Sequence, residues 1–247
     1  MIQSYDDKKD IAIVDDPVSF SLDYFLNVAK KAIADRGKFT VALSGGSTPK
    51  NLYNRLKEHK NDLQWDKVFV FFSDERSVNP DSDESNYHMA MSNGFSHLPI
   101  PKSHIFRMKA EKSIKEHADA YEELINKHVI EQSFDLILLG MGDDGHTASL
   151  FPGTKALKET TSLVVENSVP QKNTTRMTFT YPLIRKARHV VFLAYGKGKS
   201  TMVKDVLTDK TNTYPSSRVL CDHHKVLWIL DKESAKELIP PTRKSPS

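Results

Sequence analysis

The sequence contains one cysteine, Cys221, among 247 residues. A single cysteine cannot form an intramolecular disulfide, and it cannot supply the thiolates of a structural zinc site. The sequence also lacks the Gly-x-Ser-x-Gly turn of serine esterases, the His-Glu-x-x-His pair of zinc peptidases and any Cys-x-x-Cys pair. These absences argue against serine-esterase and zinc-hydrolase chemistry, and they indicate a reducing compartment.

Charge of one sign and long apolar runs are also missing. The 35 Lys and Arg residues nearly balance 32 Asp and Glu residues, so the chain has no basic stripe of the kind that nucleic-acid binders carry. No run approaches the roughly 18 apolar residues of a membrane span, and "MIQSYDDKKDIAIVDD" does not resemble a secretory signal. We therefore expect a cytoplasmic protein with neither a nucleic-acid nor a membrane partner.

The hydrophobic pattern alternates between strands and helices. "IAIVDD" (11–16) predicts a first strand, and a helix is predicted from Pro17 to the residue before Gly37. Four later apolar runs predict strands at 39–43, 67–73, 134–139 and 189–195, with helices at 49–57, 113–130 and 199–207. This alternation predicts an α/β fold, Rossmann-like, with one doubly wound and mainly parallel sheet and helices on both faces. We expect a single catalytic domain over 1–238 and a flexible tail over 239–247.

Polar or glycine-rich residues follow each of the four later strands. Ligands of open parallel sheets bind outside the carboxyl ends of the strands, so these segments are expected to meet at one crevice. The segments are 44–46, 74–76, the stretch from Gly140, and 196–199.

"LSGGSTP" (43–49) predicts a phosphate cradle. Its glycines allow successive backbone N–H groups to point in one direction, its hydroxyls add donors, and a helix is expected to begin at Pro49. The residues concerned are Ser44, Gly45, Gly46, Ser47 and Thr48. The alternative is an ordinary turn capped by Ser or Thr. Arg176 and Lys199 are candidates to complete the anion site, although each is also compatible with a solvated surface cation.

"GMGDDGHTASLFPG" (140–153) allows two interpretations. Gly140-x-Gly142-x-x-Gly145 has the spacing of a dinucleotide-binding turn, but Pro152-Gly153 interrupts the helix that such a turn requires. In the other interpretation the loop itself performs chemistry, with His146 as a general base oriented by Asp144. A structural histidine in a loop is the alternative.

Asp74 and Arg76 appear abruptly at the end of an apolar strand. Charges in that position are typical of a site at a crevice, and a surface salt-bridge cluster is the alternative.

Taken together, these motifs resemble those of the 6-phosphogluconolactonases, within the larger glucosamine-6-phosphate isomerase/deaminase-like group. The landmarks occur in order along most of the chain: "LSGGSTP" (43–49), "SDER" (73–76), "SNY" (85–87), "GMGDDGHTASLFP" (140–152), "RMTFTYPLI" from Arg176, "GKGK" (196–199), "YPSS" (214–217), and Asp231 with Ala235. Two segments depart from the family pattern, "VPQKNTTR" (169–176) and "PSS" (215–217), and they leave the phosphate contacts open.

The resemblance implies hydrolysis of 6-phospho-D-glucono-1,5-lactone without a metal or organic cofactor, by a monomer or small homo-oligomer. It implies that His146 activates water, that Asp74 and Arg76 line the reacting end, and that the cradle residues, Arg176 and Lys199 surround the phosphate. A glucosamine-6-phosphate deaminase or isomerase is one alternative, but Phe151 stands where the deaminases of this group carry a glutamate. A sugar-phosphate sensor without turnover and an NAD-dependent dehydrogenase are the others.

Overall fold

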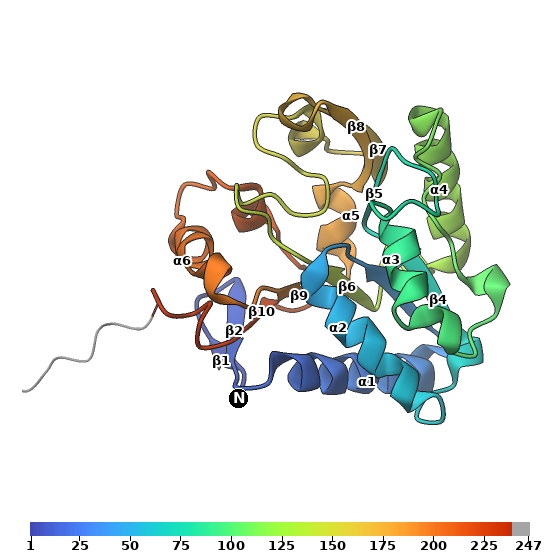
Figure 1. Ribbon diagram of the computed structural model, residues 1–247, viewed down its shortest axis with the longest axis horizontal. Helices are drawn as coiled ribbons and strands as arrows, with labels where there is room; N and C mark the ends of the chain where they lie inside the picture. Colours follow the sequence, from blue (N-terminus) through green and yellow to red (C-terminus); the bar gives the residue numbers. More distant parts are fainter. Residues whose placement is uncertain (239–247) are drawn as a thin grey trace, which may run out of the picture.

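A computed structural model describes residues 1–238, and the predicted tail over 239–247 lies outside the described residues. A seven-stranded sheet, here called the main sheet, runs through the molecule (Figure 1). In spatial order its strands are β1 (Gln3–Ser4), β2 (Lys9–Ile13), β10 (Val226–Leu230), β9 (Val190–Leu193), β6 (Leu136–Leu139), β3 (Phe39–Leu43) and β4 (Val68–Phe72). All neighbours pair in parallel except β1 and β2.

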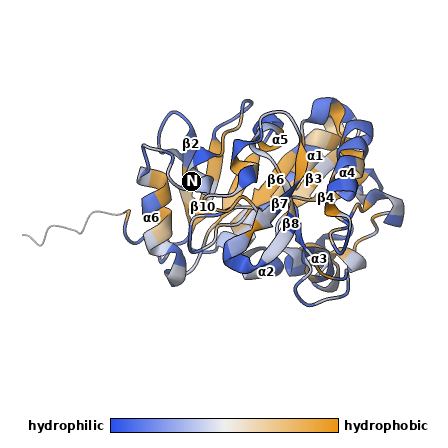
Figure 2. Cartoon of the chain, turned by 90° about the horizontal axis from the view of Figure 1, so that it is seen from above, coloured by the Kyte–Doolittle hydropathy of each residue, from blue (hydrophilic) through white to orange (hydrophobic). Residues whose placement is uncertain are grey.

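Helices pack above and below this band of apolar strands (Figure 2). They are α1 (Pro17–Arg36), α2 (Ser47–Leu56), α3 (Asn86–Ser92), α4 (Ile114–His128), α5 (Tyr181–Lys186) and α6 (Ser200–Thr208). None of the helices in the described part of the chain is long and apolar enough to cross a membrane. The predicted doubly wound, mainly parallel α/β fold is confirmed.

Helix α1 shows how local sequence sets element ends. The Asp16 carboxylate accepts a hydrogen bond from the Ser19 backbone N–H, so it caps the first turn, and Pro17 occupies a position where no donor is lost. Gly37 ends the helix in the left-handed conformation, with its N–H bonded to the Ile33 carbonyl. Both predicted ends are confirmed.

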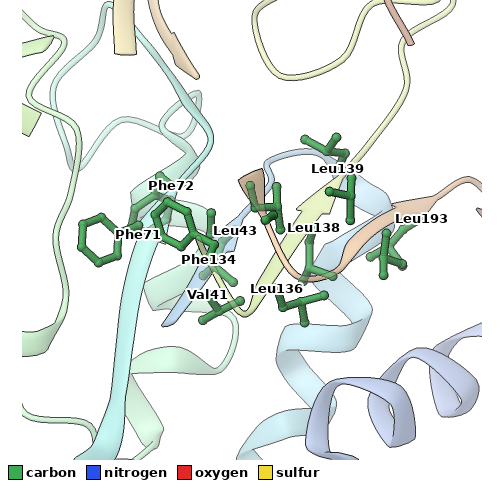
Figure 3. Packing of buried hydrophobic residues seen from close by; sticks show 14 of the residues in the cluster. Val41, Leu43, Phe71, Phe72, Phe134, Leu136, Leu138, Leu139 and Leu193 are labelled. Carbon is green, nitrogen blue, oxygen red and sulfur yellow. The ribbon is translucent and has the colours of Figure 1, made fainter. Parts of the chain in front are cut away.

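The core lies between the central strands and the surrounding helices. Every residue of β3, β6, β9 and β10 is buried, as expected for parallel strands covered on both faces. Figure 3 shows side chains of β3, β4 and β6 packed together with Phe134, whose ring lies edge-on to Phe71 at a centroid distance of 5.2 Å. This packing holds the carboxyl ends of the central strands in fixed positions.

A second sheet, here called the small sheet, was not predicted. It consists of the antiparallel strands β5 (Asp74–Arg76), β8 (Thr174–Phe179) and β7 (Val164–Val169). Ser73 connects the two sheets, because its N–H donates to the Leu43 carbonyl of the main sheet and its carbonyl accepts from the Phe179 N–H. The charged segment 74–76 is therefore a strand in its own right, and its side chains start at the junction of the two sheets.

Other element boundaries differ slightly from the prediction. The first parallel strand spans Lys9–Ile13 rather than 11–16, and α2 begins at Ser47, two residues before Pro49. The second shift matters, because it brings the first turn of the helix into the predicted cradle.

Candidate active site

A cavity of about 210 Å³ opens at the carboxyl ends of β3, β4, β6 and β9. Segments that follow these four strands form its wall, together with the first residue of α3. They are residues 44–49, Asp74 and Arg76, Asn86, residues 140–142 and 146–148, and Lys199. The convergence of four strand ends on one crevice is thus confirmed.

The loop between β3 and α2 presents backbone donors to this cavity. Gly46 precedes the helix with a φ of 95°, and no side chain caps the first turn. The N–H groups of Ser47 and Thr48 therefore have no intrahelical acceptor, and they lie at the positive end of the helix dipole. The buried Tyr53 hydroxyl fixes the loop from behind, donating to the Ser44 carbonyl at 2.8 Å. This geometry suits an anion such as a phosphate group.

Lys199 adds a positive charge on the same wall. It is the last residue of the 3₁₀ helix Lys197–Lys199, which follows β9, and its Nζ donates to the Met141 carbonyl at 2.6 Å. That bond places the ammonium between the loops after β6 and β9. Two donor hydrogens of the ammonium remain available to a ligand.

His146 lies in the loop after β6 and is paired with Asp144. The Asp144 carboxylate is 2.5 Å from the ring nitrogen Nδ1, and it also accepts from the His146 backbone N–H at 3.0 Å. Partial burial raises the pKa of Asp144, but hydrogen bonds from His146 outweigh it, so its pKa is lower than usual. An ionised Asp144 requires the proton of the imidazole on Nδ1, and this leaves Nε2 as an acceptor.

Two contacts hold the imidazole ring in place. Its plane stacks on Phe151, with ring centroids 4.0 Å apart at 20°. On another side it lies against Gly142, where an added Cβ would be 2.0 Å from the His146 Cε1 atom. The Asp144 bond, the aromatic stack and the bare glycine together restrict the ring to one orientation.

Asp74 is the acidic residue among the described residues that line the cavity, and it is only 5% exposed. Its Oδ2 accepts from the Ser149 hydroxyl at 2.7 Å, and its Oδ1 accepts from the Asn86 amide at 3.1 Å. These two hydrogen bonds fix the direction of the carboxylate. Asp74 is therefore held rigidly at the edge of the cavity.

Arg76 and Arg176 lie directly opposite each other in the pairing of β5 with β8. Arg76 lines the cavity, and its Nη1 donates to the Glu84 carbonyl at 2.9 Å. Arg176 is not in the cavity wall: its Nη1 reaches the Ser149 hydroxyl at 3.4 Å, and its guanidinium lies over the Phe151 ring. Burial lowers the pKa of Arg176. Asp144 also lies outside the wall.

The dinucleotide interpretation of residues 140–145 lacks its structural context. In the part of the chain that the structure describes, the element after this stretch is the 3₁₀ helix Lys155–Lys158, not an α-helix that begins at the turn. Gly142 has a separate reason to be glycine, namely the His146 ring. Within residues 1–238, moreover, no three His, Cys, Asp or Glu side chains are grouped so that they could hold a metal ion.

Sequence reasoning assigned no role to several residues that shape this site. Asn86 belongs to the motif "SNY", but nothing in its sequence position shows that its amide reaches Asp74. Ser149 and Tyr53 act through hydrogen bonds across 75 and 9 residues of sequence, respectively. Phe151 was noted only as a missing glutamate, and its stacking on His146 is a tertiary contact. No local sequence signal could have revealed these partners.

Comparison with known proteins gives a consistent result. Residues 16–228 match the family model described as glucosamine-6-phosphate isomerases/6-phosphogluconolactonase. A 6-phosphogluconolactonase of Chlamydia pneumoniae is 44% identical over 210 residues, covering 83% of this chain and 80% of the relative. One of Synechocystis sp. is 40% identical, covering 85% and 89%. The crystal structure of a Thermotoga maritima 6-phosphogluconolactonase is 30% identical and superposes with a TM-score of 0.81, covering 91% of this chain and all of that one.

Proposed function

Because the chain belongs to the glucosamine-6-phosphate isomerase/6-phosphogluconolactonase family, we propose that it hydrolyses 6-phospho-D-glucono-1,5-lactone to 6-phosphogluconate, a step of the oxidative pentose phosphate pathway. The observation that carries the proposal is a histidine, paired with a carboxylate, that lines the same cavity as an anion cradle. The shared name of the relatives supports the same activity.

His146 is the proposed base. Its Nε2 accepts a proton from water, and the oxygen of that water forms a bond to C1 of the lactone, so the carbonyl becomes a tetrahedral oxyanion. When the oxyanion collapses, the bond between C1 and the ring oxygen breaks, and protonated His146 returns the proton to that oxygen. Asp144 stabilises the transient imidazolium. No covalent intermediate with the protein forms, and a positioned base of this kind contributes about 10²- to 10⁴-fold.

Arg76 and Asp74 act at the reacting end in this proposal. Arg76 is a cation on the cavity wall, and among the described residues its guanidinium donates only to the Glu84 carbonyl, through Nη1. Its free donors suit the developing oxyanion, and loss of one such donor in other enzymes costs about 10²- to 10³-fold. The rigid Asp74 carboxylate suits a sugar hydroxyl, which fixes the ring relative to His146.

The phosphate does not react and serves as an anchor. Residues 44–48 and Lys199 are its proposed partners because they combine free N–H groups, hydroxyls and an ammonium on one wall. Arg176 remains a predicted phosphate ligand, although it is not part of the cavity wall. Binding energy from this remote group holds C1 near the base.

The deaminase alternative is less well supported by the site. At position 151, where the resemblance places a catalytic glutamate in the deaminases, a fully buried phenylalanine stacks on the histidine. A phenyl ring can neither donate nor accept a proton, so the acid–base step that the glutamate performs in the deaminases would lack its catalyst here.

The decisive experiment measures acid release from freshly prepared lactone, corrected for spontaneous hydrolysis. We expect rapid turnover by the wild type and a loss of at least about 10²-fold in kcat/KM for His146→Gln. His97→Gln, which changes an exposed histidine outside the cavity, is the matched control and is expected to retain activity. A wild type that adds nothing to the spontaneous rate contradicts the proposal. Ammonia release from glucosamine 6-phosphate and calorimetric binding of 6-phosphogluconate then distinguish the deaminase from the sensor.

A further inference from the structure

The side-chain amide of Asn86 lies between two walls of the cavity. Asn86 is 3% exposed and is the first residue of α3. Its Nδ2 donates to the Asp74 backbone carbonyl at 3.0 Å and to the Asp74 carboxylate at 3.1 Å. Both amide hydrogens are thus used on one residue. Because these Asp74 oxygens are acceptors, the amide nitrogen must face Asp74, and Oδ1 must point the other way.

On that other side Oδ1 meets the cradle loop at Gly45. A Cβ at Gly45 would lie 1.9 Å from Oδ1 and 2.4 Å from Cγ of Asn86. These separations are far below van der Waals contact, so the loop backbone packs directly on the amide and leaves no room for a side chain. The amide therefore acts as a spacer between the cradle loop and the Asp74 carboxylate.

The backbone of Asn86 is anchored independently of its side chain. Glu75, which is 3% exposed, accepts hydrogen bonds from the backbone N–H groups of Asn86 at 2.8 Å and Tyr87 at 3.0 Å, and from the Ser85 hydroxyl at 2.9 Å. Truncation of the Asn86 side chain leaves these bonds intact. The start of α3 is consequently expected to keep its place in such a variant.

We infer that Asn86 is a positioning residue that sets the distance between the phosphate cradle and Asp74. The kinetic test of this inference rests on the proposed function, in which the cradle holds the phosphate and Asp74 faces the reacting end. Without the amide, Asp74 loses one of its two carboxylate partners, and the loop loses the surface on which it packs. Misplacement of a reacting group by about 1 Å can cost about 10²-fold in rate. Asn86→Ala is expected to lower kcat by about 10-fold or more and to change KM much less.

A double-mutant cycle with Gly45→Ala tests the spacer directly. In the wild-type background the new methyl must displace the amide, so we expect kcat/KM to fall by about 10-fold or more and the melting temperature to fall as well. In the Asn86→Ala background the three atoms nearest to that methyl are gone, and the same change is expected to cost less than about threefold. Asn86→Gly removes the Cβ that Asn86→Ala retains, and it provides a second background. If Gly45→Ala lowers kcat/KM by the same factor in the Asn86→Ala and Asn86→Gly backgrounds as in the wild type, the inference is wrong.

Asn93→Ala is the matched control for the cycle. Asn93 follows the other end of α3 and contacts neither Gly45 nor Asp74: its Nδ2 donates to the Met89 carbonyl at 2.8 Å, and its Oδ1 accepts from the Asn54 amide near the end of α2 at 3.3 Å. The loss of kcat/KM caused by Asn93→Ala is expected to be independent of that caused by Gly45→Ala, so the double variant should show the product of the two losses. If Asn86→Ala changes only the melting temperature and leaves kcat intact, the residue is structural and the positioning role is wrong.

The melting temperatures separate this inference from the proposed function. Wild type without lactonase activity disproves the function, while compensation between Gly45→Ala and Asn86→Ala in melting temperature still supports the spacer. Wild type with activity but without compensation disproves the spacer alone.

Discussion

The main sheet and the small sheet contribute to the site in different ways. The central strands of the main sheet are apolar throughout, and they carry polar groups only in the loops after their carboxyl ends. The small sheet places charged residues within a strand, at Asp74 and Arg76 of β5, and its strand β7 alternates between buried and exposed positions. The carboxylates of β5 are nonetheless buried, with Asp74 5% and Glu75 3% exposed, and hydrogen bonds satisfy both of them. Under the proposed function, the small sheet supplies Asp74 and Arg76 to the reacting end, whereas the loops after the main-sheet strands supply the cradle, Lys199 and the base His146.

The loop after β6 connects the two regions. His146 is positioned from the main sheet, but Ser149, three residues later, bonds to Asp74 and to the Thr178 hydroxyl of the small sheet. This loop therefore links His146 to Asp74 of the small sheet. Under the proposed function, variants of the small sheet should lower kcat, and variants of the cradle wall should raise KM.

The largest expected effect within this comparison belongs to Arg76. Arg76→Ala removes a cation from the small sheet that we assign to the oxyanion, so kcat is expected to fall by about 10²- to 10³-fold with a smaller change in KM. Arg185→Ala, which breaks an exposed ion pair with Asp222, is the control and is expected to have little effect. Steady-state kinetics measure both. A rise in KM alone would place Arg76 at the phosphate instead and remove the distinction between the two sheets.

The next effect tests the main-sheet side. Lys199→Ala removes the cradle ammonium, so KM is expected to rise about 10-fold and competitive inhibition by inorganic phosphate to weaken, while kcat changes little. Lys197→Ala, an exposed lysine two residues away, is the matched control. A fall in kcat at constant KM would show that Lys199 acts at the reacting end.

A smaller effect concerns the ring beneath the histidine. Phe151→Leu keeps an apolar side chain but loses the stack on His146, and aromatic pairs of this kind contribute about 0.5 to 1.5 kcal/mol. We expect kcat to fall by up to about 10-fold without a comparable change in KM. Phe179→Leu removes an equally buried ring of β8 and should reduce the melting temperature without this change in kcat. Equal kinetic losses in both variants would argue against a specific role of the stack.

The smallest effect on activity is expected at the amino ends of the main-sheet strands, opposite the carboxyl ends where the cavity opens. His189, just before β9, is largely buried between Tyr24 and the stacked ring of His224, and this burial lowers its pKa to about 4. Between about pH 6.5 and 4 the unfolded chain binds a proton that the folded chain does not, so stability falls as the pH is lowered through this window. The melting temperature of His189→Gln should depend less on pH there than that of the wild type, with unchanged kcat/KM at neutral pH. Parallel curves for the two proteins would contradict this assignment.

Local signals predicted much of the fold and the identity of most wall residues. Pro17 and Gly37 delimit α1 because each has a conformational preference that acts at one position. The apolar runs predicted β3, β4, β6 and β9 because covered parallel strands need no alternation. The small sheet escaped prediction because β5 has only three residues and lies directly after β4, and because β7 and β8 carry polar residues on their accessible positions.

The sequence by itself determined groups that occur in consecutive residues: the glycine and hydroxyl pattern of the cradle, the candidate base His146, and the charges after β4. Spacing alone could not show that Asp144 pairs with His146, whose Nδ1 the structure places 2.5 Å from the Asp144 carboxylate. Tertiary structure alone decided which groups meet across the cavity. It brought Arg176 to the Ser149 hydroxyl rather than into the cavity wall, placed Ser149 and Asn86 on Asp74, and set Phe151 against His146. The physical reason is range: capping, turn formation and strand periodicity act within a few residues, whereas hydrogen bonds and stacking between distant segments depend on where the packed core places each strand end.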